Sequence, residues 1–174
     1  MAPDAPGGHA VPAPLTPPLV ELRPLVSADA ATIASWSLDP RFVAGADWTP
    51  DLSLEVHVAF QLRIVTDPPA DLIRLGAVHE GELVGYVDLH GHEPRRRELG
   101  YVIGDSHRWG RGYGGAAARA GLAYGFGVLG LTEIWAEALT GNTASVRILQ
   151  GLGMTEIDHG APGPYRRFTI SVGS

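Results

Sequence analysis

The stretch ELGYVIGDSHRWGRGYGG, residues 98–115, joins a run of β-forming side chains to a glycine-rich turn. The alanine-rich segment that follows predicts a helix that starts inside the turn and runs through Ala116 to about Leu129. A turn that enters a helix exposes unpaired amide N–H groups and the positive end of the helix dipole, and glycines let these groups approach an anion closely. We therefore predict a site for phosphate oxygens, to which Arg108 and Arg111 add charged contacts.

Two other interpretations of the turn were weighed. Gly110, Gly112 and Gly115 satisfy G-x-G-x-x-G, and Glu133 and Glu137 lie about 20 positions further on, as in dinucleotide-binding domains. That fingerprint follows the first strand of its domain, whereas here several predicted strands precede the turn and only about 60 residues remain after it. A dinucleotide domain is therefore disfavoured, and a purely structural turn with exposed arginines stays as the simplest alternative.

The rest of the chain alternates predicted strands and helices. Strands are predicted at residues 19–23, 72–79, 83–90, 98–104, 132–139, 154–158 and 165–172. Further helices are predicted at residues 28–36, from Asp51 or Ser53 to Val65, and at residues 143–150. Asp39 and Pro40 are interpreted as the end of the first of these helices. Ser27 and Asn142 are the predicted N-caps of the first and last of these helices. For the helix after the glycine turn, the residues predicted to be available for a buried face are Ala120, Leu122, Ala123, Phe126 and Leu129.

Composition narrows the class of protein. The 174 residues are 45% hydrophobic, which suits one domain, and no window approaches the roughly 18 apolar residues of a membrane span. The sequence contains no cysteine and its 13 basic residues are all arginine, which excludes thiol chemistry and a lysine Schiff base. A net charge of −6 disfavours nucleic acid as a partner. Residues 1–18 are interpreted as a disordered proline-rich tail before a domain at 19–174, and we expect a cytoplasmic protein.

Residues 109–114, Trp-Gly-Arg-Gly-Tyr-Gly, resemble the acetyl-CoA pyrophosphate loop of the GCN5-related N-acetyltransferase (GNAT) superfamily, written Q/R-x-x-G-x-G/A. Trp109 departs from the usual first residue of that loop. Together with residues 98–104 and the N-x-x-S-x-x-x-L pattern that begins at Asn142, this departure resembles the ribosomal-protein alanine acetyltransferase branch. The likeness covers roughly residues 19–172. It implies an α+β fold, a single acyl-CoA N-acyltransferase domain with a central, mixed, mostly antiparallel sheet flanked by helices.

The resemblance also implies acetyl-CoA as the cofactor and requires no metal. In that superfamily the strand here at residues 99–103 splays from the strand at 134–138, and the pantetheine arm pairs with the first of them. The residues that the likeness implies in cofactor binding are Val102, Ile103, Arg108, Arg111, Gly112, Tyr113, Gly114, Gly115 and Asn142. The run Arg95-Arg96-Arg97 is interpreted as a solvated loop, with contact to the cofactor's 3′-phosphate as the alternative.

Acyl transfer to an amine needs a base for the amine proton and a proton donor for the departing thiolate. By resemblance, Glu98 is the candidate base and Ser145 the candidate donor. Glu98 has two other interpretations, as an anchor for a cationic substrate or as a partner of Arg97. The alternative bases are His90, Asp88 and His92. Asn142 and Ser145 also have a structural interpretation, as the N-cap and first turn of a helix.

The acceptor wall is predicted in residues 36–55, where Trp48 and Asp47 are the candidate substrate-binding residues together with His90. Trp36 and Phe42 are interpreted as core residues. The resemblance favours a protein or peptide amino terminus as the acceptor, with a small amine as the alternative. A third hypothesis, from another class, is a noncatalytic acyl-CoA sensor. Neither nucleic acid nor a membrane is an expected partner, and a homodimer is left open.

Overall fold

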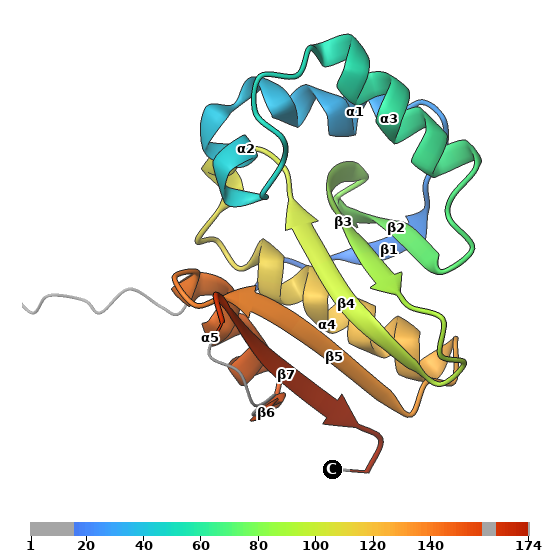
Figure 1. Cartoon of the computed structure of the whole chain (residues 1–174), viewed down its shortest axis with the longest axis vertical. Coiled ribbons are helices and arrows are strands. Elements are labelled where there is room, and N and C mark those ends of the chain that lie inside the picture. Colours follow the sequence, from blue (N-terminus) through green and yellow to red (C-terminus); the bar gives the residue numbers. More distant parts are fainter. Residues whose placement is uncertain (1–15, 158–162, 174) are drawn as a thin grey trace, which may run out of the picture.

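A seven-stranded sheet organises the computed structural model, which describes residues 16–157 and 163–173 (Figure 1). The strand order is β1-β2-β3-β4-β5-β7-β6, and every neighbouring pair is antiparallel except β4 and β5. The strands are β1 (Glu21–Pro24), β2 (Leu72–His79), β3 (Glu82–His90), β4 (Arg96–Ile103), β5 (Glu133–Leu139), β6 (Thr155–Ile157) and β7 (Tyr165–Ser171). This mixed, mostly antiparallel sheet confirms the predicted fold class.

The helices lie on both sides of this sheet. They are α1 (Asp29–Ser35), α2 (Pro40–Gly45), α3 (Leu54–Thr66), α4 (Tyr113–Gly127) and α5 (Thr143–Gly151), with short 3-10 turns at Trp36–Leu38 and Ser106–Arg108. Trp36 stacks on Tyr86 of β3, whereas the next residue of that strand, Val87, faces α4. Because successive strand residues point to opposite faces, the layer of α1 to α3 and helix α4 cover opposite sides of the sheet.

The hairpin of β2 and β3 was predicted correctly and turns through Glu80 and Gly81. Both residues have positive φ values, 50° and 82°, as a two-residue hairpin turn of the primed type requires. The pairing places Arg74 opposite Asp88 and Leu72 opposite His90. It therefore brings charged side chains of two strands to one face of the sheet.

Helix α4 packs closely on the sheet through its smallest residues. A Cβ atom on Gly121 would come within 2.7 Å of Leu99 and 2.8 Å of Val87, and one on Gly125 within 2.6 Å of Ile134. The predicted buried face was therefore only partly right. Leu122 is buried, but Ala123 is exposed, and Ala120, Phe126 and Leu129 are half-buried because the glycines turn their own side of the helix inward.

Two local predictions near the amino terminus were wrong. Ser27 is not the N-cap of α1, whose N-cap is Ala28, since the carboxylate of Asp29 instead accepts the Val26 amide and the Arg23 guanidinium. The short helix α2 was missed. Asp39 and Pro40 had been interpreted as the end of a helix, whereas Asp39 is an N-cap that accepts the Arg41 amide at 2.9 Å and Pro40 occupies the first turn.

Some predictions fall outside the described residues. Most of the predicted tail, residues 1–15, and the connection at residues 158–162 lie there. The strand predicted at 154–158 is confirmed as β6, with Asp158 outside the described part. Across the described part of the chain, none of the helices has the length and apolar character needed to cross a bilayer.

Candidate functional site

Strands β4 and β5 touch only at one end, and the site begins where they part (Figure 1). Their parallel pairing joins residues 96–98 to residues 133–135 and stops at the pair Glu98 and Trp135. Beyond that pair, β4 stays bonded to β3 and β5 stays bonded to β7. Within the described residues, the edge of β4 at 99–103 therefore has no strand partner on its β5 side, so its backbone groups can pair with an extended ligand.

The glycine turn meets this opening at the start of α4. Gly112 is the N-cap, with φ 90° and ψ −4°, and its carbonyl accepts the Ala116 amide at 3.0 Å. The amides of Tyr113, Gly114 and Gly115 belong to the first turn, where a helix offers no carbonyl partner. The turn thus presents a concentration of N–H donors at the positive end of a 15-residue helix.

Trp109 and the amino-terminal segment both brace this turn. The Trp109 indole N–H donates to the Ile103 carbonyl at 2.9 Å, which ties the turn to the end of β4. A Cβ atom on Gly112 would lie 3.1 Å from Pro18, so Pro17 and Pro18 pass alongside the turn. The residue that departs from the common loop pattern therefore has a structural role here.

The two arginines of the turn have different surroundings. Arg108 is only 14% exposed in its side chain and pairs with Glu82 at 2.5 Å, with Asp105 a further 3.6 Å contact. Arg111 is exposed and has no ion pair in the described part of the chain. The structure therefore leaves Arg111, rather than Arg108, available to an anion.

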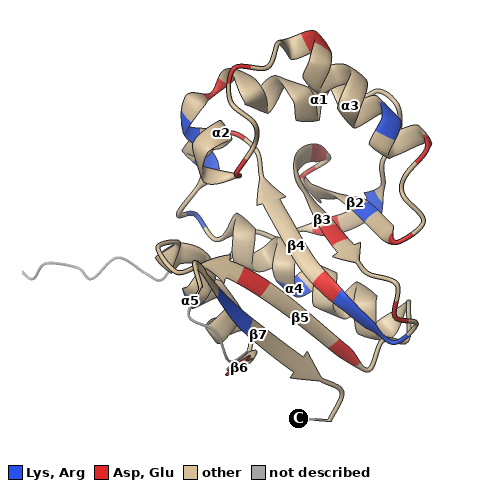
Figure 2. Ribbon diagram, in the orientation of Figure 1, with Lys and Arg blue, Asp and Glu red and all other residues tan. Residues whose placement is uncertain are grey.

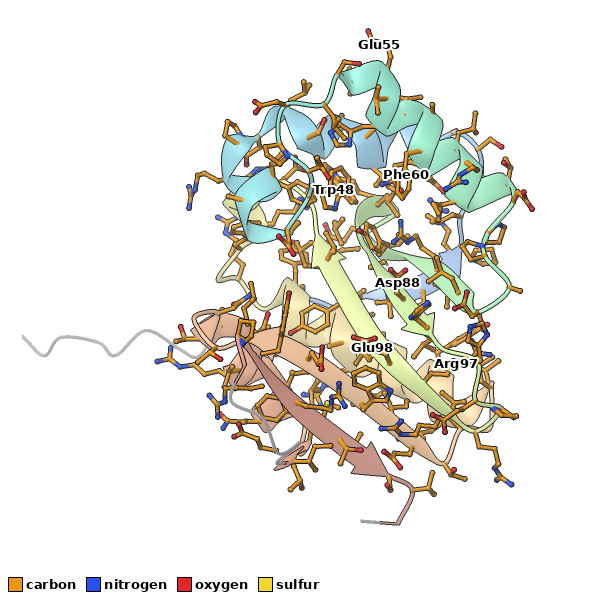
Figure 3. The ribbon with its side chains drawn as sticks, in the orientation of Figure 1. Trp48, Glu55, Phe60, Asp88, Arg97 and Glu98 are labelled. Atoms are coloured by element: carbon orange, nitrogen blue, oxygen red, sulfur yellow. The ribbon has the colours of Figure 1, made fainter. Side chains whose placement is uncertain are left out.

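Glu98 is a half-buried carboxylate at the point where β4 and β5 separate (Figure 3). No hydrogen bond or ion pair engages its side chain among residues 16–157 and 163–173. Burial raises its pKa above the ordinary 4.5, and the neighbouring charges of Glu137 and Asp88 raise it further, against opposing effects of His90 and Arg167. A carboxylate with a raised pKa is a stronger base than usual, which suits proton removal from an amine.

The carboxylates that neighbour Glu98 are paired with arginines. Figure 2 shows acidic positions on β3, β4 and β5 and basic positions on β2, β4 and β7. Asp88 accepts two hydrogen bonds from Arg74, at 2.8 and 2.7 Å, and Glu137 accepts two from Arg167. Arg74 also lies 3.9 Å over the Tyr86 ring. Glu98 is therefore the carboxylate of this face that stays without an arginine partner.

The alternative bases also have partners in the structure. His90 and His92 both contact Asp71, at 3.0 and 3.2 Å, and Asp88 is held by Arg74. His90 faces the same side of the sheet as Glu98, because the two residues are directly paired across β3 and β4. The geometry thus favours Glu98 over the three alternatives as the free base.

Asn142 and Ser145 begin α5. Asn142 is the N-cap and its Oδ1 accepts the Ser145 amide at 3.1 Å, as predicted. Sequence reasoning assigned no role to Tyr101, whose hydroxyl is buried and forms no hydrogen bond within the described part of the chain. The sequence did carry a signal for this position. Side chains on a strand alternate between its two faces, so the side chain at 101 is expected on the face opposite to Glu98, where the helix after the glycine turn packs.

The predicted acceptor wall is a packed aromatic cluster. Trp36 and Phe42 are buried, as expected, and Trp48 packs edge-on against Phe42 at 4.9 Å. The other side of Trp48 stacks on His57 of α3 at 5.1 Å. Asp47 is exposed and has a positive φ of 55°. The structure brings Trp48 into the layer above the sheet and leaves Asp47 at the surface.

Sequence reasoning also missed the polar inner face of α3. His57 and Gln61 are 6% and 2% exposed, although apolar residues of the same helix, such as Val56 and Phe60, are exposed. Their spacing of four residues was the signal, since it places both on one helix face. In the described residues, His, Asp and Glu do not gather in a group that could hold a metal ion.

Comparison with known proteins adds to this geometry. Residues 20–155 match the family model of the acetyltransferase (GNAT) domain. The FsC-acetyl coenzyme A-N(2)-transacetylase of Aspergillus fumigatus is 30% identical over 152 residues, which cover 80% of this chain and 63% of the relative. The chain therefore spans less than two thirds of that relative's length.

Solved structures share the fold at lower identity. The aminoglycoside acetyltransferase AAC(6′)-Ib in complex with coenzyme A gives a TM-score of 0.74 at 18% identity, covering 88% of this chain and 95% of that one. Spermidine N-acetyltransferase from Vibrio cholerae, in complex with CoA and spermine, gives 0.71 at 20% identity, with coverage of 87% and 95%. At these identities the likeness establishes the arrangement of the chain.

Proposed function

The chain belongs to the GNAT acetyltransferase family, and on that premise we propose that it transfers an acetyl group from acetyl-CoA to a primary amine, with Glu98 as the base. The observation that carries the proposal is Glu98 itself. It is the carboxylate without an arginine partner on its face of the sheet, it has a raised pKa, and it stands where β4 and β5 separate. The Aspergillus relative, by its name an acetyl coenzyme A-N(2)-transacetylase, supports transfer to nitrogen.

The residues around the opening fit acetyl-CoA, which supplies an activated acetyl thioester when it is bound. The free edge of β4, including Val102 and Ile103, offers backbone groups to the pantetheine arm. The first-turn amides of Tyr113, Gly114 and Gly115, next to Gly112, would hold the pyrophosphate together with Arg111. Asn142 is available to the pantetheine arm. Arg108 contributes only if it leaves Glu82.

The proposed chemistry divides between two side chains. Glu98 removes the proton of the bound ammonium, so that the neutral amine attacks the thioester carbonyl. Ser145, in the first turn of α5, donates a proton to the thiolate that leaves. Because Glu98 is already partly desolvated, the ammonium becomes its partner only when the acceptor binds, and the proton transfer is completed within that pair.

The acidity of the acceptor favours an α-amine, which agrees with the resemblance to the ribosomal-protein alanine acetyltransferase branch. An α-ammonium has a pKa near 7.8, whereas a lysine-like alkylammonium has one near 10.4. The Glu98 carboxylate therefore takes the first proton more readily from an α-ammonium than from an alkylammonium, because the α-ammonium is the stronger acid. We therefore propose a protein or peptide amino terminus as the acceptor.

A small amine is the second candidate acceptor, and the polar residues of α3 that lie over the sheet favour it. The inward residues His57 and Gln61 of α3, with Trp48, give this side of the fold a polar cover. Such a cover suits a compact polar acceptor better than a continuous apolar groove would. For either acceptor, we place Trp48, Asp47 and His90 in the substrate-binding region.

The first test is cofactor binding. Acetyl-CoA at a hundredfold excess over its Kd should stabilise the fold by about 2.7 kcal/mol, whereas NAD should not. The second test is release of CoA in the presence of amino-terminal peptides and of small amines. Turnover with peptides supports the first acceptor and turnover with small amines alone supports the second. Binding of acetyl-CoA without turnover of any amine would instead support a noncatalytic sensor.

A further inference from the structure

The face of the sheet that carries Glu98 is covered by helices at one end only. The layer of α1 to α3 lies over that end, whereas no described helix lies over β5 and β7 on this side (Figure 1). Glu98, Trp135 and Thr169 are direct partners across β4, β5 and β7, so their side chains stand next to one another on this face. All three are half-buried. An acceptor whose amine reaches Glu98 therefore has the surroundings of Trp135 beside it.

Trp135 is flanked by two guanidinium groups. The Cζ atom of Arg167 lies 4.5 Å from the centre of the indole ring, and that of Arg96 lies 5.5 Å from it. The face of an indole attracts cations, which makes it a common place for the ammonium group of a ligand. Because two cations already lie on Trp135, a second ammonium group of the acceptor would meet positive charge there. This arrangement disfavours a polyamine and favours an acceptor with negative charge beside its amine.

Arg167 uses only part of its guanidinium for its carboxylate partner. Its Nε and Nη2 both donate to the same oxygen of Glu137, Oε1, at 2.9 and 2.5 Å. Within the described part of the chain, Nη1 has no hydrogen-bond partner, and the side chain is 33% exposed. A guanidinium has five N–H donors in a planar fork, so it can hold Glu137 and a second carboxylate together. Burial raises the pKa of Glu98, and Arg167 is close enough to that carboxyl group to oppose the rise.

Glu98 and Arg167 thus place a carboxylate without a partner and a guanidinium with free donors on one open surface. An ammonium and a carboxylate are the complementary pair of groups. A free α-amino acid carries both, and so does a peptide whose first side chain is acidic. We propose that Arg167 is a specificity-determining residue that binds a carboxylate of the acceptor while the amine lies at Glu98. The inference rests on the proposed function above and narrows its acceptors to amines with a carboxylate a few bonds away.

Two matched pairs of acceptors test this proposal and separate the two sources of the carboxylate. Alanine and alaninamide differ in the carboxylate of a free amino acid, and two tripeptide amides that begin with glutamate or glutamine differ in that of a side chain. For at least one pair, the kcat/KM of the acid should exceed that of its amide roughly tenfold or more, mainly through KM. The pair that shows this preference identifies the source. Putrescine, a diamine without a carboxylate, should be a poorer acceptor than the preferred acid.

Arg167→Gln and Glu137→Gln should change this preference in opposite directions. Arg167→Gln removes the guanidinium, so the kcat/KM of the acid should fall to the level of its amide. Glu137→Gln releases the guanidinium from its carboxylate partner, so the KM for the acid should fall below that of the unmodified protein. Arg166→Gln is the matched control, because Arg166 pairs with Glu156 and is 31% exposed but points to the other face of the sheet. It should keep the preference unchanged.

Several results would overturn the role of Arg167. These are equal kcat/KM for acid and amide in both pairs, or a loss of preference in Arg166→Gln as large as in Arg167→Gln. A weaker preference in both Arg167→Gln and Glu137→Gln would show that their ion pair only supports the fold. Glu137→Gln keeps Arg167 in place, so it decides the question if Arg167→Gln does not fold. Turnover of all the amines without discrimination would leave the acetyltransferase intact, whereas absence of turnover with every amine would count against the proposed function itself.

Discussion

Helices α4 and α3 lie on opposite faces of the sheet and present opposite chemistry to it. The buried residues of α4 are Ala117, Ala118, Gly121, Leu122 and Gly125, which bring its backbone close to β3 and β4. Helix α3 buries His57, Gln61 and Ile64 and turns Val56 and Phe60 toward solvent. Helix α4 therefore packs against the sheet through small, closely fitting residues, whereas α3 presents hydrogen-bonding side chains to it.

The α4 face of the sheet has a structural role, whereas the α3 face carries the polar and charged groups that surround Glu98. On the α4 face the contacts leave no room for an added carbon, so that face fixes the positions of β3 and β4. On the α3 face Gln61 accepts from Arg74, and Arg74 holds Asp88. Because these groups satisfy one another, Glu98 is, of the neighbouring carboxylates Asp88 and Glu98, the one left to act on a ligand. Each prediction below changes one face and measures whether the other responds.

The largest expected effect comes from Glu98→Gln, which keeps the shape and removes the base. General-base assistance is worth ~10²- to 10⁴-fold, so kcat should fall within that range at neutral pH while affinity for acetyl-CoA stays unchanged. Raising the pH should recover part of the rate, because more acceptor is then already deprotonated. Glu21→Gln, on the exposed edge strand β1, is the matched control. A raised KM with intact kcat would show that Glu98 only anchors a cation.

The same variant has an opposite effect on stability. The pKa of Glu98 is raised in the folded protein, so its carboxyl group favours the fold below the ordinary pKa of 4.5 and loses that contribution as pH rises through the folded value. At neutral pH, Glu98→Gln should therefore have a Tm equal to or above that of the unmodified protein, with the difference shrinking at acidic pH. Thermal unfolding across this pH range checks the sign, and a lower Tm at neutral pH would contradict it.

The next largest expected effect is the loss of stability caused by Gly121→Val, on the α4 face. A valine there must displace Leu99 and Val87, which already lie 2.7 and 2.8 Å from the first added carbon. Overpacking of this kind costs about 3 kcal/mol. Gly127→Val is the control, since the same change on the same helix meets open space. Denaturant unfolding should separate the two variants, and equal stabilities would show that the α4 face tolerates expansion.

Gly112→Val changes α4 at its start, where we propose that acetyl-CoA binds, rather than on its packed face. The N-cap conformation, with φ 90°, is unfavourable for a β-branched residue, and the added carbon meets Pro18. The first-turn amides should shift with the turn, which weakens acetyl-CoA binding roughly tenfold or more, or about 1.4 kcal/mol. Calorimetric titration of the folded variant measures this loss, with Gly127→Val again as reference. An unchanged Kd would show that the turn is structural.

The elements with a strong local signal were predictable. The hairpin at Glu80 and Gly81, the strand before the glycine turn and the cap at Asn142 each follow from residues close in sequence, and the structure has them. The boundaries of α4 also came out within a few residues, although its buried face did not. Glycines carry no hydrophobic signal, so a pattern of apolar residues could not show that Gly121 and Gly125 face the sheet.

The rest depended on long-range contacts. The interpretation of Asp39 and Pro40 as a helix end failed because the same dipeptide begins a helix when the aspartate accepts an amide two residues on. The neutralisation of Asp88 by Arg74 spans 14 residues and two strands, so only the register reveals it. The free state of Glu98 is likewise a property of its neighbours. Sequence alone named Glu98 as a candidate base, and the lack of an arginine partner for its carboxylate in the structure supports that proposal.

The last prediction tests the polar face of α3 through Gln61→Leu. This change keeps the side-chain size but removes the acceptor for Arg74, 3.1 Å away, while the two bonds from Arg74 to Asp88 remain. The loss of one charge-assisted bond should lower the free energy of unfolding by about 1–2 kcal/mol. Leu62→Gln, the reverse change on the exposed side of α3, should stay within about 0.5 kcal/mol. Without the Gln61 bond, Arg74 is hydrogen-bonded to Asp88 alone and gains mobility, which weakens its average neutralisation of that carboxylate. Since Asp88 raises the pKa of Glu98, the acid limb of kcat should then move to higher pH. If Gln61→Leu instead stabilises the protein and leaves that limb in place, the inward polar groups of α3 are not coupled to the site.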